Sequence, residues 1–202
     1  MVLALVGAFA ILAGTNRAAE AQTSPDPNAD APPPEQKRAW DFLVTSGSLV
    51  PTGAQRDAIK RGNLTVAQFS YAVRRPIAIT ASLGWARSRD VATAGDPKLN
   101  VFTYDLGTEF RGPRWGDRDA VNFSPFAGVG AGARSYDYRG LDSDATHKVS
   151  TYLSTGGELG LGRVGLRVEV RDYVTGFRLN GDGTAGTRND VAVMVGLRLG
   201  TR

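Results

Sequence analysis

The sequence predicts an all-β fold, an eight-stranded antiparallel up-and-down transmembrane β-barrel. Apolar and polar residues alternate through eight segments of the 202-residue chain, which is the period of a strand with two different faces. The connections after the odd-numbered segments are long, and those after the even-numbered segments are short. All long connections would then lie at one end, which is typical of outer-membrane barrels and has no reason in a soluble barrel.

The clearest element is a hairpin over residues 148–177, whose two halves join at Gly162-Arg163. On each side of this dipeptide, apolar and threonine residues alternate with polar, charged and glycine residues. A two-residue loop that begins with Gly suits a primed turn, because that turn needs a positive φ angle. The turn fixes the predicted cross-strand pairs, which are Leu161 with Val164, Gly160 with Gly165, Leu159 with Leu166, and Glu158 with Arg167. We expect the last pair to form a cross-strand ion pair.

The other six strands follow less distinct patterns. They are predicted at residues 41–50, 64–73, 77–86, 102–111, 121–134 and 191–200, and Pro51-Thr52-Gly53 stops the first of them. Alternation alone allows two arrangements, because the apolar face is either the core of a soluble barrel or the lipid-facing side of a membrane barrel. Charged and small residues recur on one face of the later strands, and a charged face would be costly in hydrocarbon. We therefore place the charges in the lumen and the aliphatic residues toward lipid.

The start of the chain has the composition of a targeting segment. Residues 2–14 form an apolar run that is too short to span a membrane, and Ala19-Glu20-Ala21 has the A-x-A form of a cleavage site. We interpret residues 1–21 as a secretory signal peptide. Residues 22–38 are rich in Pro, Asp and Gln and predict a disordered leader, so the barrel is assigned to residues 39–202.

Composition and motifs exclude several classes of function. The formal net charge of +4 comes from basic residues dispersed among acids, without the Lys/Arg run of nucleic-acid binding. Cysteine is absent, so there is no disulfide scaffold and no thiolate metal site. The sequence has no P-loop, G-x-S-x-G or zinc pattern, and Gly181-Asp182-Gly183 lacks the spacing of an EF-hand loop. We expect no catalytic, cofactor-binding or metal-binding residues.

Charged residues on the predicted inner face form the candidate site. They are Glu109, Arg134, Glu158, Arg167, Glu169 and Arg171. An eight-stranded barrel encloses only enough space for side chains, and buried charges persist when they are paired. We interpret the set as a structural ion-pair network that plugs the lumen, and the alternative is a gated or ion-selective passage. Many of the 25 glycines fall on the same face and would make room for these long side chains.

Three features lie outside the lumen. His147 is the only histidine, and Ser150 is an odd number of residues away on the same strand, so the two side chains point to opposite faces. We therefore interpret His147 as an exposed rim residue and not as the base of a catalytic pair. Asp172 falls on the lipid face, so we expect it at or above the outer interface. Basic and acidic residues mix in the outer loops, which favours solvated loops over a site for anionic lipid.

Three segments carry a resemblance to the small eight-stranded outer-membrane β-barrels, the class of the OmpA membrane domain and OmpX. They are FSPFAGVGAGARSYDYRG (123–140), GGELGLGRVGLRVEVRDYVTGF (156–177) and VAVMVGLRLG (191–200). The resemblance implies an outer-membrane location, contact with membrane lipid and insertion by the barrel-assembly machinery. It is nearly silent on function, because such barrels anchor, adhere, conduct or catalyse according to their loops.

Three hypotheses of function follow. We expect a monomeric, non-enzymatic barrel that is structural or interacts through its outer loops with a ligand that the sequence does not name. One alternative is an outer-membrane lipid-modifying enzyme or small pore. Another is a soluble periplasmic β-barrel that binds an apolar ligand inside.

Overall fold

The computed structural model describes residues 39–53, 56–57, 59–91, 95–116, 121–139, 145–178 and 185–200. The predicted signal peptide and leader lie outside these residues. No helix among the described residues is long and apolar enough to cross a membrane.

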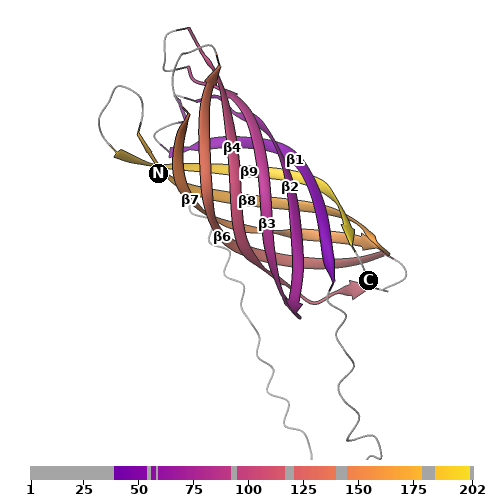
Figure 1. The fold of residues 1–202 in the computed structure, drawn as a ribbon. Coiled ribbons are helices and arrows are strands. Elements are labelled where there is room, and N and C mark those ends of the chain that lie inside the picture. The colour runs from indigo at the N-terminus through magenta and orange to yellow at the C-terminus, as the bar shows by residue number, and fades with distance from the viewer. Residues whose placement is uncertain are drawn as a thin grey trace, which may run out of the picture. The chain divides into compact units, whose positions relative to one another are not determined.

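Eight long strands close into one antiparallel barrel (Figure 1). They are β1 (Trp40–Thr52), β2 (Gly62–Arg74), β3 (Ile77–Arg89), β4 (Lys98–Arg111), β6 (Val121–Arg139), β7 (Thr146–Leu161), β8 (Val164–Arg178) and β9 (Ala185–Gly200). Each long strand pairs with the next long strand along the chain, and β9 pairs with β1. The short strand β5 (Trp115–Gly116) pairs with the start of β6, and β4 pairs directly with the rest of β6. The predicted all-β, eight-stranded, up-and-down barrel is confirmed.

The strands are steeply inclined to the barrel axis (Figure 1). Following the paired residues once round the barrel from Phe42 of β1 returns to β1 at Thr52, ten residues further along. Such a stagger in an eight-stranded barrel corresponds to a tilt of about 45°, which leaves an interior that side chains can fill. The register therefore dictates a packed lumen.

The central hairpin has the predicted turn and register. Gly162 adopts a φ of 62°, which the first residue of a primed turn requires. Leu161 pairs with Val164, Gly160 with Gly165, Leu159 with Leu166, and Glu158 with Arg167. The four predicted backbone pairs are all confirmed.

The strands extend further into the connections than the sequence predicts. β4 begins at Lys98, β6 ends at Arg139 and β9 begins at Ala185, because backbone pairing continues where the apolar alternation has stopped. The connection between β4 and β6 was expected to be short, and this prediction is wrong. It spans residues 112–120 and contains β5. The other two connections at the same end of the barrel are tight turns, at residues 75–76 and 162–163. We call this end the inner end and the other the outer end.

The outward face of the barrel is apolar on every long strand. Its exposed large side chains include Phe42, Val44, Phe69, Ile79, Leu83, Leu106, Val129, Leu153, Leu166, Val168, Val195 and Leu197. At the inner end, Trp40 stacks on Phe69 and Trp115 stacks on Phe123, as in the aromatic girdle of a membrane barrel. Exposure of so many aliphatic residues is incompatible with water, so the soluble-barrel alternative is wrong.

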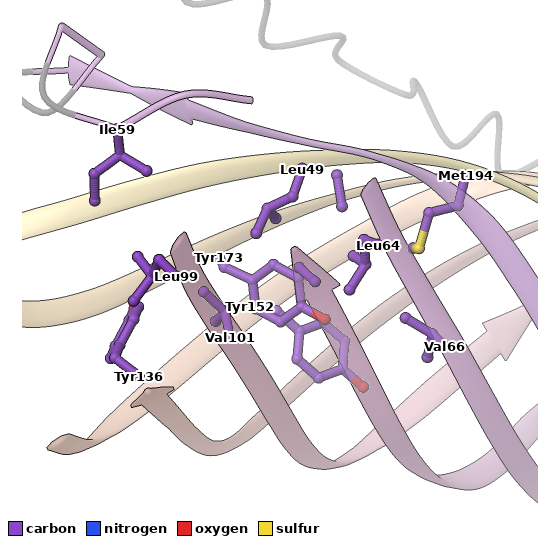
Figure 2. Packing of buried hydrophobic residues seen from close by; sticks show 12 residues of the cluster. Leu49, Ile59, Leu64, Val66, Leu99, Val101, Tyr136, Tyr152, Tyr173 and Met194 are labelled. Carbon is purple, nitrogen blue, oxygen red and sulfur yellow. The ribbon is translucent and has the colours of Figure 1, made fainter. Parts of the chain in front are cut away.

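The interior of the outer half holds an apolar cluster that the sequence analysis did not predict (Figure 2). Its members are Leu49, Ile59, Leu64, Val66, Ala86, Leu99, Val101, Tyr136, Tyr152, Tyr173, Ala192 and Met194. Figure 2 shows Tyr152 and Tyr173 close to Leu49, Leu64 and Val101. The outer half of the lumen therefore contains buried apolar side chains, which the expected filling by charged residues does not include.

Candidate functional site

A chain of alternating acids and arginines runs through the inner part of the lumen. In order, its members are Glu158, Arg198, Asp41, Arg111, Glu109, Arg167, Glu169, Arg171 and Asp105. The N–O distances of its eight links are 2.6, 2.7, 2.6, 2.8, 2.6, 3.0, 2.7 and 3.6 Å. Strand alternation directs all nine side chains inward. The paired charges can therefore compensate one another's loss of hydration.

Arg167 is the centre of this chain. From β8 it donates to Glu109 of β4 at 2.6 Å and to Glu169 of its own strand at 3.0 Å. Its guanidinium carbon lies 3.4 Å from the ring centroid of Phe126. All three charged side chains are at most 4% exposed, so the contacts form away from water, where such interactions are strongest. Arg167 of β8 therefore binds a residue of β4 and also packs on a ring from β6.

Arg171 connects the ionic chain to the apolar cluster. It donates to Glu169 at 2.8 Å and to the side-chain oxygen of Gln68 on β2 at 3.0 Å. Its guanidinium carbon lies 4.5 Å from the ring centroid of Tyr152. The Tyr173 hydroxyl in turn donates to Asp105 at 3.2 Å. The Tyr173 hydroxyl and the Tyr152 ring thus contact the ionic chain, and both tyrosines belong to the apolar cluster.

A second ion cluster lies nearer the outer end. Asp190 of β9 accepts from both Arg134 of β6 and Arg188 of its own strand, and all three side chains are at most 1% exposed. The Arg134 guanidinium carbon lies 4.0 Å from the ring centroid of Tyr173. Together the two clusters contain six arginines and six carboxylates, so the formal charges of the luminal network cancel.

The structure separates the predicted site residues into two groups. Glu109, Glu158, Arg167, Glu169 and Arg171 all belong to the inner chain, whereas Arg134 belongs to the outer cluster. The predicted ion pair between Glu158 and Arg167 is not among the ion pairs of the described residues, although their backbones are paired. Glu158 instead binds Arg198 at 2.6 Å, because a long side chain in a narrow barrel reaches several walls as easily as its own cross-strand neighbour.

Six members of the network were not in the predicted set: Asp41, Asp105, Arg111, Arg188, Asp190 and Arg198. The alternation already places Asp105, Arg111 and Arg198 on the polar face of their strands, so that signal was available. Arg188 lies in a segment interpreted as a loop, and Asp41 begins a weakly patterned strand.

Some luminal glycines make room for aromatic rings and others for polar or charged side chains. A Cβ atom on Gly156 would lie 2.6 Å from the ring of Phe126, and one on Gly130 would collide with the ring of Tyr152. Near the ionic chain, a Cβ on Gly165 would lie 3.2 Å from a Glu158 carboxylate oxygen. The expectation of space for long charged residues therefore describes only some of these glycines.

The outer rim carries two further polar features. His147 is exposed on β7 and Ser150 is 2% exposed on the inner face, so the two lie on opposite faces as predicted. Tyr138 donates to Asp90 at 2.9 Å, and burial together with this carboxylate raises the pKa of Tyr138 to about 12. Among the described residues, no group of three or more His, Cys, Asp or Glu side chains could hold a metal ion.

The fold and the exposed side chains define a small, closed, eight-stranded antiparallel β-barrel with an apolar outer face. No protein-family model and no curated protein matches the sequence. Neisserial surface protein A has a similar structure, with a TM-score of 0.56 and 12% identity over 80% of this chain and 97% of that protein. The N-terminal barrel domain of Pseudomonas aeruginosa OprF also matches, with a TM-score of 0.47 and 10% identity over 80% of this chain and 97% of that domain. P. aeruginosa OprG matches with a TM-score of 0.46 and 13% identity over 82% of this chain and 95% of that protein. The likeness to Neisserial surface protein A shows a shared barrel fold.

Proposed function

We propose that this protein is a monomeric outer-membrane scaffold with a closed lumen, which neither conducts ions nor catalyses a reaction and acts through its outer surface. The observation that carries the proposal is the bond of 2.6 Å between Arg167 and Glu109. Their strands, β8 and β4, lie three places apart in the ring of eight, with β6 and β7 between them, so the bond crosses the lumen.

Two further observations support a closed lumen. The six luminal arginines are all ion-paired, and four of them also lie over an aromatic ring. An ion that crossed would have to break several buried pairs and then pass the apolar cluster toward the outer end. Breaking one buried pair costs about 3 to 5 kcal/mol. Passage through the resting barrel is therefore unfavourable.

Conductance of the purified protein in planar lipid bilayers tests this proposal. We expect no discrete current steps from the parent. The quadruple variant Glu109→Ser, Arg167→Ser, Glu169→Ser, Arg171→Ser removes the middle of the ionic chain as a balanced set of charges. Steps from this variant would establish that the assay detects an opened lumen, whereas steps of similar size from the parent would overturn the proposal.

Fractionation tests the location and the processing. The protein should partition with outer membranes, require detergent for extraction, and migrate differently on a gel before and after boiling. Mass spectrometry of the mature chain should give a first residue of Gln22 if residues 1–21 are a cleaved signal. Recovery in the soluble fraction without detergent would contradict the proposed location.

The absence of catalysis rests on the surroundings of His147. Its cross-strand partner is Ser135, and among the described contacts no hydrogen bond joins these two side chains. Lipid extracts of cells that express the parent or the His147→Ala variant should have the same composition. A modified lipid that disappears with the variant would favour a lipid-modifying enzyme instead.

A further inference from the structure

Three cations lie side by side on the outward face at the outer end of the barrel. Arg89 of β3 pairs with Lys98 of β4, and Lys98 pairs with Arg139 of β6. All three side chains are exposed. Like charges directly opposite one another on neighbouring strands destabilise a sheet, so this row lowers the stability of the isolated barrel. An anion that binds all three would reverse the effect.

The row forms part of a basic pocket of about 370 Å³. Its lining adds Lys60, Arg61 and Arg87 to the row, and it contains no acidic residue. The segment that carries Lys60 is fixed against β3, because the Lys60 amide donates to the Arg89 carbonyl at 2.9 Å. Six cations from four parts of the chain are therefore held around one hollow. The sequence, read as mixed outer loops, did not predict this.

These six cations take no part in the ion pairs of the described residues, which all lie within the lumen. Two acids close by are already engaged, since Asp90 accepts from Tyr138 and Asp137 accepts from Asn100. A third, Asp96, lines an adjoining hollow with all three residues of the row. The pocket keeps a large excess of positive charge.

An apolar hollow lies on the same side of the barrel, nearer the inner end. It has a volume of about 660 Å³, and the small residues Ala67, Ala81, Ala131 and Ala133 form much of its lining. It spans β1, β2, β3, β4 and β6, so it shares β3, β4 and β6 with the basic pocket. Figure 1 shows β3 and β4 adjacent along their length.

Strand β3 connects the two hollows. Leu83 lines the apolar one and Arg87 the basic one, and the intervening Trp85 is exposed on the same face. The Arg87 guanidinium carbon lies 4.1 Å from the Trp85 ring centroid. Leu83 and Arg87 are four positions apart along the strand, which corresponds to about 13 Å. Tryptophan and arginine in this order are typical of a membrane–water interface.

We propose that this side of the barrel binds a phosphate-bearing lipid of the outer leaflet. The phosphates bind the row Arg89–Lys98–Arg139 and the cations around it, and an acyl chain lies in the alanine-lined hollow. The inference rests on the proposed membrane location and adds a ligand to it. A soluble polyanion would use the basic pocket alone, whereas the two aligned hollows match both ends of a lipid.

Retention of lipid by the full chain tests the proposal. The parent is placed in phosphatidylcholine nanodiscs that contain a small fraction of a diphosphorylated glucosamine lipid, or of the same lipid without its phosphates. Native mass spectrometry then measures the lipid that remains bound. We expect selective retention of the phosphorylated form, and a roughly hundredfold loss in the variant Arg89→Gln, Lys98→Gln, Arg139→Gln, because each cation contributes about fivefold near an anionic lipid surface.

A matched control removes three exposed cations at the inner end, with Arg74→Gln, Arg75→Gln and Arg163→Gln. It should retain the phosphorylated lipid as the parent does. In plain phosphatidylcholine the row variant should unfold at the same temperature as the parent or higher, because a repulsive row is removed. Equal retention by parent and row variant, or equal loss in the control, would overturn the proposal.

The acyl-chain part has its own test. Ala81→Phe fills the apolar hollow and should weaken retention of the lipid without changing the binding of inorganic pyrophosphate. Displacement of the lipid by pyrophosphate at equal concentration would assign the pocket to soluble phosphates and overturn the lipid assignment. A parent that folds in nanodiscs but retains no lipid contradicts only this inference, whereas a chain that is not heat-modifiable contradicts the proposed function.

Discussion

Arg167 of β8 donates to Glu109 of β4 at 2.6 Å and thereby joins two strands that are not neighbours in the barrel. Strand pairing connects each wall only to its neighbours. This bond therefore adds a cross-connection that the sheet itself lacks. Because both side chains are buried, the bond also occupies space inside the lumen. In the closed lumen that we propose, paired charges fill the inner part.

Replacing Arg167 with methionine should lower the free energy of unfolding by about 3 kcal/mol. The change keeps an unbranched side chain over Phe126 but leaves Glu109 and Glu169 each with one fewer cation. Urea unfolding in detergent, followed by the heat-modifiable gel shift, measures the loss. Arg163→Met at the exposed inner turn is the matched control and should change stability by less than about 0.5 kcal/mol. Equal midpoints for the two variants would contradict the central role of Arg167.

The hairpin shows how far the sequence predicts this fold. A two-residue turn and strict alternation determine which backbone positions pair, and the register from Glu158 to Leu161 is as predicted. The choice of ion-pair partner depends on the way in which long side chains meet inside the closed barrel, and the sequence does not define that geometry. Glu158 therefore binds Arg198 and not Arg167. The inward aliphatic residues, such as Leu64, were missed because the inward face of β2 changes from Leu64 and Val66 to Gln68 and Ser70 along the strand. Alternation does not show where such a change occurs.

Removing the charge of a luminal carboxylate should destabilise the barrel more when that carboxylate is more deeply buried. Glu169 is 0% exposed and binds two arginines, whereas Glu158 is 15% exposed and binds one. Glu169→Gln should therefore lower the free energy of unfolding by about 3 kcal/mol, and Glu158→Gln by about 1 kcal/mol or less. Both substitutions preserve side-chain volume, so the comparison isolates charge. Equal losses would indicate that the inner end of the lumen excludes water as fully as its middle.

A single methyl group at Gly130 should destabilise the barrel. A Cβ at this position collides with the ring of Tyr152, which packs between the ionic chain and the apolar cluster. Gly130→Ala should lower the free energy of unfolding by about 1 to 3 kcal/mol, as expected for overpacking. Gly176→Ala is the control, because its Cβ would meet no atom within 4 Å. If Gly130→Ala is as stable as this control, the ring of Tyr152 does not occupy the position described.

The half-buried Tyr138 should titrate above the ordinary range of a tyrosine. Its pKa is raised to about 12, first by burial and then by the Asp90 carboxylate that accepts its hydrogen bond. A folded-state pKa above the ordinary value of about 10 means that this contribution to stability is complete below pH 10. It is lost as the pH rises through 12. Absorbance titration of tyrosinate should therefore show a component near pH 12 in the parent that the Tyr138→Phe variant lacks.

The position of Asp172 tests where the membrane boundary crosses the barrel. Asp172 is exposed on the outward face of β8, and its cross-strand partners are Leu153 and Val191. A carboxylate in the middle of the hydrocarbon would be costly, so we expect it at or above the outer interface. The chain has no native cysteine, which permits labelling of single Asp172→Cys, Gly176→Cys and Leu166→Cys variants with a water-soluble maleimide in intact cells. Gly176→Cys should react fastest, Asp172→Cys more slowly, and Leu166→Cys hardly at all, because positions closer to the turn at residues 162–163 lie further from the outer surface. An Asp172→Cys variant as protected as Leu166→Cys would place the carboxylate within the hydrocarbon, and the outer boundary would then have to lie further along β8.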